Sequence, residues 1–479
     1  MKAKLCKTVF VLACITILSA VQSKAQFIED ALRLTGTNSI ITPRVGGLNV
    51  AYHGISDDIG ALLYNPAGLT ISPYPEISIG MGFSRNNSQT DFLSELNTMK
   101  TNDEFVSHFG LSSPIQSNNR AYAVGIGYFN ESNFGNMFHY EGFNQTSSFI
   151  GWEAQNGPRN FNDNIATFLT LADSNFRTPI KDSIYQKGTV EETGGLHNIT
   201  GAIAFEVSDN VSIGVSLSGK FGTYGYNRSY FEIDTRHKYD YWDQQNFTNV
   251  DFDKLDVNEK IKQNISGITG SIGIMARITD FIRLGATVKF PTWYEINEDF
   301  SQTATADFDN GQSTDVPYKN VGSTRYNITT PFIYCAGASV NMMGLTFSAG
   351  IEYTDVSQLS FSDATDAVMN LNPVMKTQLV GQTTWGFGAE YKIPLVPVVV
   401  RASYASTTSP YMQDIANAYI SYVSLGGGLY LSPNVRVDVL VRWKDYSELR
   451  TNYGTIENGS TYILTQKPMS MGLQLTYRY

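Results

Sequence analysis

Few residues of this chain have the types and spacing that catalysis or metal binding requires. The five histidines have no zinc-binding or hydrolase spacing. They are His53, His108, His139, His197 and His237. Of the three cysteines, Cys6 and Cys14 lie within the first 25 residues, so Cys335 has no disulfide partner once these residues are cleaved off. We therefore expect no enzyme, no bound metal and no cofactor.

Cations on the polar faces of alternating segments offer a different chemistry, which is the binding of an anion such as a carboxylate. Lys220, Arg283 and Lys289 lie opposite large apolar residues in segments with a period of two, and Arg401 and Arg442 share this setting. The same cations would equally pair with acidic side chains of the protein itself. The sequence does not choose between these two roles.

The segments that carry these cations are predicted to be β-strands with one apolar and one polar face. Residues 469–479 alternate without a break and end on an aromatic residue, and similar alternation covers 435–444, 282–290 and 211–220. We count about fourteen such strands after residue 75, an even number as in bacterial outer-membrane barrels. A large soluble β-sandwich or propeller is the alternative.

The connections between these strands alternate strictly between short and long. Short turns are predicted at 208–210, 279–280, 341–343 and 432–434, and long polar connections at 87–103, 132–194, 227–265, 295–323, 357–375, 408–416 and 449–459. This order is typical of periplasmic turns and extracellular loops. We therefore predict an all-β fold, a transmembrane antiparallel β-barrel over residues 76–479, in the outer membrane of a Gram-negative bacterium.

The N-terminus and the net charge further narrow the class of protein to which this chain can belong. Residues 1–25 are predicted to be a signal peptide, because three lysines precede an apolar run and Ser23-Lys24-Ala25 suits cleavage after Ala25. No later stretch of about 18 apolar residues could form a spanning helix. The formal net charge of −10 argues against a nucleic-acid partner.

Residues 26–75 do not alternate and are rich in glycine. A short helix is predicted to start at Ser56, with its hydroxyl as cap, and to end at Asn65-Pro66. We expect this segment to fold into the barrel lumen as a hatch, or plug. A periplasmic cap or linker is the alternative.

The hexapeptide Tyr64-Asn65-Pro66-Ala67-Gly68-Leu69, placed between the short helix and the first strand, resembles the FadL/TodX family of outer-membrane hydrophobic-compound transporters. Residues 282–291 resemble the middle strand of that family, and the resemblance covers the whole mature chain. Tyr479 departs from it, because the last residue of the family is usually Phe. The resemblance implies a hatch motif at Asn65, Pro66, Ala67 and Gly68.

The function that this resemblance implies is passive uptake of hydrophobic small molecules, most of all long-chain fatty acids or aromatic hydrocarbons. A general porin, or a structural or adhesive barrel without a hydrophobic ligand, is the alternative. Besides the ligand, the implied partners are outer-membrane lipids and the barrel assembly machinery. We expect the protein to be a monomer.

Two further sites follow from the resemblance. Ile165, Phe168, Leu169 and Ala172 share one face of a predicted helix in a long loop and resemble a first capture site for ligand. A helix that only packs within its own loop would look the same. Gly125 and Gly127 would allow the third strand to bend for lateral exit of ligand, although glycine in a strand more often marks close packing.

Overall fold

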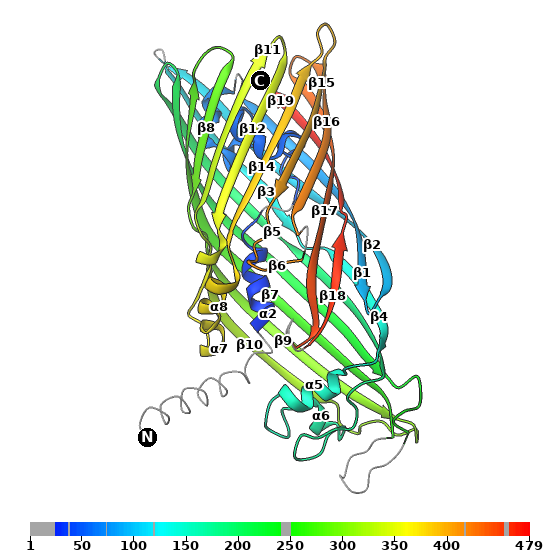
Figure 1. Ribbon diagram of the computed structural model, residues 1–479. Helices are drawn as coiled ribbons and strands as arrows, with labels where there is room; N and C mark the ends of the chain where they lie inside the picture. Colours follow the sequence, from blue (N-terminus) through cyan, green and yellow to red (C-terminus); the bar gives the residue numbers. More distant parts are fainter. Residues whose placement is uncertain are drawn as a thin grey trace.

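The computed structural model describes residues 24–36, 39–72, 74–117, 120–240, 251–415, 418–454 and 459–479. Residues 1–23 of the predicted signal peptide lie outside these ranges. The described chain forms one sheet of 19 strand segments, which closes on itself because β1 pairs with both β2 and β19. Figure 1 shows the resulting tall, tilted barrel.

The strand segments have the following bounds. They are β1 (Glu76–Phe92), β2 (Glu95–Ser117), β3 (Arg120–Asn133), β4 (Asn136–Asn144), β5 (Ile184–Ser208), β6 (Val211–Ile233), β7 (Phe252–Arg277), β8 (Ile282–Lys289), β9 (Trp293–Phe308), β10 (Tyr318–Thr329), β11 (Ile333–Met342), β12 (Leu345–Asp355), β13 (Ser360–Ser362), β14 (Gly381–Lys392), β15 (Val398–Thr407), β16 (Ile420–Ser432), β17 (Val435–Tyr453), β18 (Ser460–Gln466) and β19 (Met469–Arg478).

Helices lie inside the barrel and in its loops. They are α2 (Lys24–Arg33), α3 (Pro43–Leu48), η2 (Asn49–Gly54), α4 (Ala61–Tyr64), η3 (Pro66–Ile71), α5 (Phe149–Asn156), α6 (Ile165–Phe168), η4 (Val356–Gln358), α7 (Asp366–Met369) and α8 (Leu371–Gln378). No helix in these ranges is both long enough and apolar enough to cross a membrane.

The predicted fold class is confirmed, as a closed antiparallel barrel with 14 strand positions. Five positions hold two consecutive segments, and in three of them the two segments share a neighbour, as β8 and β9 share β7. Three of the interruptions contain a proline, at Pro291, Pro331 and Pro468. Proline has no N–H to donate to the ladder, so a strand is readily broken there.

The alternation predicted for the C-terminal strand is confirmed. Leu473 and Leu475 of β19 are exposed on the outer face, and Ile79 of β1 is exposed next to them. Gln474 and Thr476 point inward and are buried. The outer face near the short turns is therefore apolar, as contact with lipid requires.

Three of the predicted long loops are instead strands. β1 and β2 continue through 87–103 and meet at a turn of Leu93 and Ser94. Paired strands also form residues 227–233, 252–265, 295–308 and 318–323 of the next two ranges, within which 241–250 lie outside the described residues. These strand ends lie beyond the apolar part of the wall, where neither face needs apolar side chains. The period-of-two pattern is therefore missing although the backbone stays extended.

The short connections agree with the sequence-based prediction. The four short turns lie where they were expected. Residues 371–378 form α8, and the strand β14 begins after it at Gly381. In Figure 1 the loop that carries α5 and α6 lies at one end of the barrel and the C-terminus lies at the other.

Candidate functional site

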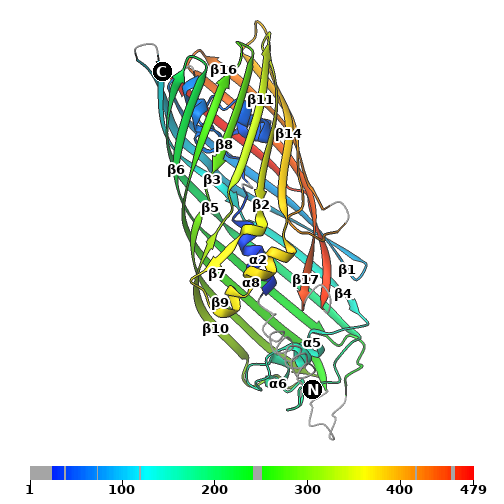
Figure 2. The same cartoon turned by 60° about the vertical axis from the view of Figure 1, so that its left-hand side comes forward.

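Residues 28–36 and 39–72, together called the N-terminal segment below, lie inside the ring of strands (Figures 1 and 2). Within it, α3 packs against β14 to β17, η2 against β11, β12 and β14, and η3 against β5, β6 and β7. Wall glycines allow this close approach. A Cβ atom on Gly350 would lie 2.1 Å from the Val50 carbonyl oxygen, and one on Gly273 would lie 2.1 Å from Asn65 Oδ1. The first strand begins at Glu76, immediately after the range predicted for the hatch.

The predicted hatch motif joins this segment to the barrel wall. Asn65 Oδ1 accepts a hydrogen bond from Ala67 N at 3.2 Å and so caps η3. Its Nδ2 donates to the Ile274 carbonyl of β7 at 3.0 Å. Pro66 opens η3, where its missing N–H costs nothing. A Cβ atom on Gly214 of β6 would lie 2.4 Å from Ala67 N, so the turn sits directly on the wall.

Gly68 completes the motif for a steric reason, because a Cβ atom there would lie 2.0 Å from the Ser56 carbonyl oxygen. The helix predicted to start at Ser56 is wrong in its bounds, since α4 covers only Ala61–Tyr64. Ser56 has a φ of 39° and donates its hydroxyl hydrogen to the Tyr52 carbonyl at 3.0 Å. Asp58 Oδ1 accepts hydrogen bonds from Tyr52 Oη at 2.6 Å and from Gly60 N at 2.9 Å, so this acid belongs to a buried network just before α4.

The three cations predicted to bind a carboxylate already face carboxylates of this chain. Lys220 Nζ lies 2.7 Å from Glu131 Oε1, and Lys289 Nζ lies 3.8 Å from Glu352 Oε2. Arg283 Nη1 lies 3.1 Å from Asp57 Oδ2 of the N-terminal segment. These contacts match the alternative in which lumenal cations pair with lumenal acids. Their use by a ligand stays a prediction.

A cavity of about 480 Å³ occupies the lumen beside the N-terminal segment. Lys220 and Lys289 line it, whereas Arg283 is not among its lining residues. Aromatic side chains such as Tyr64, Phe105 and Phe134 share the lining with these charged groups. The lumen therefore offers both apolar surface and fixed charges to a solute.

A second, apolar hollow of about 770 Å³ lies on the outer wall. Val124, Ile203, Leu217, Ile268 and Trp293 of five different strands line this outer groove. Four residues line both the groove and the lumenal cavity, namely Ser216, Thr269, Gly270 and Phe290. The lumenal cavity and the outer groove therefore share a boundary at these residues.

The strand ladder is interrupted at the same place. Pairing of β7 with β8 ends at Ser271 and Lys289, and pairing with β9 begins at Ile268 and Trp293. Between these pairs, Phe290 N donates to the Gly270 carbonyl at 2.8 Å and Thr269 Oγ1 donates to the Phe290 carbonyl at 2.9 Å. We call this interruption the seam, residues 269–270 against 290–292.

The predicted exit strand is regular at its two glycines. Gly125 and Gly127 of β3 pair with both neighbouring strands without a register shift, and the first shift lies between Asn130 and Ser132. Cβ atoms on them would lie 2.9 Å and 3.2 Å from δ-carbons of Leu62, so they make room for the N-terminal segment. Gly125 also lines the outer groove. A role of this strand in lateral exit stays a prediction.

The predicted capture residues lie in an apolar cluster within the loop end of the barrel. Ile165, Leu169 and Ala172 are buried there, and Phe168 packs partly buried against the same cluster. The ring of Phe168 meets that of Tyr318 edge-on, with centroids 5.5 Å apart. None of the four is among the residues that line the lumenal cavity.

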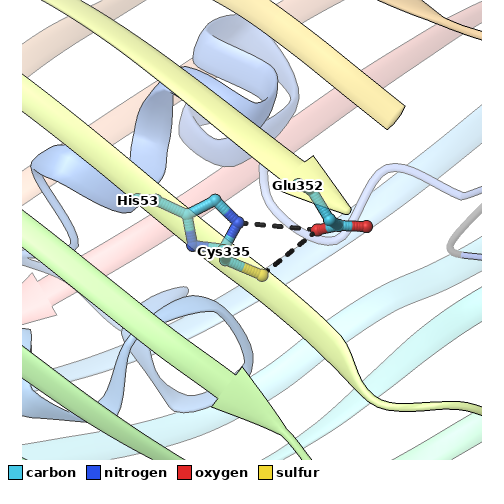
Figure 3. A group of neighbouring side chains, drawn as sticks. All are labelled: His53, Cys335 and Glu352. Atoms are coloured by element: carbon cyan, nitrogen blue, oxygen red, sulfur yellow. Dashed lines mark hydrogen bonds and ion pairs between the residues drawn. The ribbon is translucent and has the colours of Figure 1, made fainter. Parts of the chain in front are cut away.

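A group that the sequence did not suggest lies between η2 and the wall. Figure 3 shows His53 of η2 beside Cys335 of β11 and Glu352 of β12. Their ligand-type atoms all lie within 4.8 Å of one another. The three residues are far apart in sequence, so no motif spacing could have indicated them.

Comparison with known proteins gives the fold. No protein-family model matches the sequence, and no curated protein matches it. Among solved structures, a Pseudomonas aeruginosa FadL homologue is similar with a TM-score of 0.58 at 12% identity, over 91% of this chain and 98% of that one. The Pseudomonas putida toluene transporter TodX has a TM-score of 0.51 at 12% identity, over 88% of this chain and 94% of that one.

A deltaS2 mutant of the TodX monoaromatic hydrocarbon channel has a TM-score of 0.53 at 13% identity, over 91% of this chain and 99% of that one. These likenesses cover 88–91% of this chain. The chain therefore has the fold of the FadL homologue and the TodX channel, as the hatch motif and strand pattern predicted.

Proposed function

We propose that this protein is an outer-membrane channel through which hydrophobic small molecules enter a Gram-negative cell without energy input. Long-chain fatty acids are the first candidate ligands, and aromatic hydrocarbons are the second. The fold shared with a FadL homologue and a toluene transporter supports this proposal. The N-terminal segment would act as the hatch that prevents free diffusion through the lumen.

The observation that carries the proposal is the common boundary of the lumenal cavity and the outer groove. A water-filled pore gives an apolar solute no advantage, whereas burial of apolar surface favours it by about 25 cal/mol per Å². The outer groove is lined by apolar side chains and opens toward lipid. A solute that passes the seam would move from the lumen into the membrane without crossing bulk water.

The mixed lining of the lumenal cavity favours a ligand with both an apolar body and an anionic head. Lys220 and Lys289 would attract a carboxylate, but each first has to share its charge with Glu131 or Glu352. A fatty acid fits this description better than a hydrocarbon does. The apolar residues of the outer groove would then accept its chain.

The experiment compares two tryptophan variants in a strain that lacks the wild-type gene. Gly201 lines the outer groove, and a Cβ atom there would have no neighbour within 4 Å, so Gly201→Trp would fill the groove without strain. Gly219 of β6 has equally open surroundings but does not line the groove. We expect Gly201→Trp to reduce uptake of a labelled long-chain fatty acid and Gly219→Trp to leave it unchanged.

Sugar uptake measured in the same strains tests the alternative. A hydrophobic-compound channel should lose fatty-acid uptake on gene deletion and keep permeability to small sugars. If deletion lowers sugar uptake and leaves fatty-acid uptake intact, the barrel is a general porin. If deletion changes neither, a structural or adhesive role is favoured. Equal uptake by both tryptophan variants would show that the ligand does not pass through the outer groove.

A further inference from the structure

His53, Cys335 and Glu352 bring three different ligand atoms to one point between the N-terminal segment and the wall (Figure 3). His53 Nε2 lies 3.6 Å from Glu352 Oε2, and Cys335 Sγ lies 3.6 Å from the same oxygen. The His53 side chain is completely buried. Neither of its ring nitrogens has a hydrogen-bond partner in the described part of the chain.

Buried polar groups in proteins are nearly always satisfied, so a buried ring whose nitrogens form no hydrogen bond, and whose Nε2 only faces the Glu352 carboxylate at 3.6 Å, calls for an explanation. Four-coordinate zinc has bonds of about 2.0–2.3 Å to N, O and S, which place neighbouring ligand atoms about 3.3–3.6 Å apart. The two separations of 3.6 Å agree with that spacing. A nitrogen and a sulfur ligand exclude hard ions such as Mg²⁺ and Ca²⁺, which prefer oxygen.

We infer that His53, Cys335 and Glu352 form a binding site for a zinc-like divalent transition-metal ion that ties the N-terminal segment to the barrel wall. The metal would take one nitrogen, one sulfur and one oxygen from the protein, and water would complete its coordination. The Cys335 thiol proton would leave to lumenal water, because the ligand is the thiolate.

The backbone around His53 is held in place before any ion binds. A Cβ atom on Gly285 of β8 would lie 2.2 Å from the His53 carbonyl oxygen, and one on Gly337 of β11 would lie 2.4 Å from Gly54 N. The Tyr64 ring covers the imidazole at a centroid distance of 5.0 Å. Such rigid support lowers the entropic cost of gathering the ligands.

A metal ion can reach the site from the lumen, where it competes with the Lys289 ammonium for Glu352. Glu352 lines the lumenal cavity, so a hydrated ion can reach its carboxylate from the lumen. Lys289 Nζ lies 3.8 Å from the Glu352 oxygen that also faces His53 and Cys335. Its ammonium would have to move aside when a metal binds. Lys289→Met should therefore raise metal affinity.

The test uses Co²⁺ as a spectroscopic substitute for Zn²⁺ with the full mature protein in detergent after treatment with a chelator. We expect about one Co²⁺ per chain, with a thiolate-to-cobalt absorption band that added Zn²⁺ abolishes. Cys335→Ser should lose the band, and His53→Ala should weaken binding at least about tenfold. His108→Gln is the matched control, because His108 is also buried but already contacts Ser78 at 2.8 Å and Ser107 at 3.0 Å.

A measurement on the wild type covers the case in which a variant fails to fold. Zn²⁺ should slow alkylation of Cys335 by iodoacetamide and raise the temperature at which the barrel unfolds on a gel. Co²⁺ binding without a thiolate band, or alkylation at the same rate with and without Zn²⁺, would show that the three side chains only pack together. Equal weakening by His53→Ala and His108→Gln would also overturn the assignment.

Discussion

Arg44 of the N-terminal segment and Glu390 of β14 form a two-pronged ion pair between the interior of the barrel and its wall. Arg44 Nε lies 2.9 Å from Glu390 Oε2, and Nη2 lies 3.0 Å from Oε1. Arg44 Nη1 also contacts Asp57, and it lies 3.1 Å from Asp58 Oδ2. Arg401 Nε of β15 lies 2.5 Å from Glu390 Oε2, the oxygen that also accepts from Arg44 Nε. The network fixes the segment to the wall through charges that few water molecules can screen.

Replacing Arg44 should release this part of the N-terminal segment. Arg44→Met leaves Asp57, Asp58 and Glu390 short of a cation, and breaking a buried pair costs about 3–5 kcal/mol. We expect faster proteolysis within residues 39–72 and a higher conductance in planar bilayers. The control is Arg325→Met, whose partner Glu295 lies at 2.5 Å but with both side chains largely exposed, a pair worth about 0–1 kcal/mol. Identical behaviour of the two variants would mean that the network does not hold the segment.

The tight packing around Gly68 gives a steric test of the hatch. Gly68→Ala would place a methyl group 2.0 Å from the Ser56 carbonyl oxygen, so the turn has to move off the wall. Gly36→Ala in the same segment meets nothing within 4 Å and serves as the matched control. We expect Gly68→Ala to show intermittent openings, and deletion of residues 27–68 to give a permanently conducting pore. A deletion that conducts no more ions than the wild type would refute the plug.

The local stability of the tip of the β9–β10 connection should depend on pH. Burial and the neighbouring Asp240, together with Asp253 and Asp251, raise the pKa of Asp309 to about 6 from its ordinary value of 3.8. Because the folded state binds this proton more tightly, the tip is most stable below about pH 4, and that stability is lost as the pH rises through about 6. Hydrogen exchange at residues 308–312, corrected for intrinsic rates, should reveal more opening at pH 7.5 than at pH 5. Asp309→Asn should abolish the difference, and Asp315→Asn should preserve it.

The barrel could be predicted from the sequence wherever lipid constrains both faces of a strand. Ile77, Ile79 and Met81 alternate with small or polar residues because one face meets lipid and the other meets the lumen. Beyond the lipid this requirement ends, and the stretch from Asn87 to Asp91 of β1 has no apolar face. The strands nevertheless continue as paired hairpins. Their length was therefore not predictable from periodicity.

The candidate sites were less predictable because they depend on register between distant segments. The Asn65–Gly68 motif could be recognised because its four consecutive residues resemble a family motif, and in the structure Asn65 bonds to the wall. The group of His53, Cys335 and Glu352 forms only when η2 lies against β11 and β12. The seam likewise arises where β8 ends and β9 begins on a shared neighbour. No spacing along the chain encodes such proximity.

Substitutions at and near α6 can distinguish a packing role of this loop from a role in ligand capture. Leu169 is fully buried in the loop cluster, so Leu169→Ala should cost about 2–5 kcal/mol locally and make residues 145–183 sensitive to protease. Phe161, which is 46% exposed, is the control, and Phe161→Ala should leave the loop resistant. If Leu169 only packs, the half-saturating fatty-acid concentration for uptake should stay unchanged in both variants. A loop that stays resistant while this concentration rises in Leu169→Ala would instead identify α6 as the first contact of the ligand, because lost binding without lost packing requires a direct role.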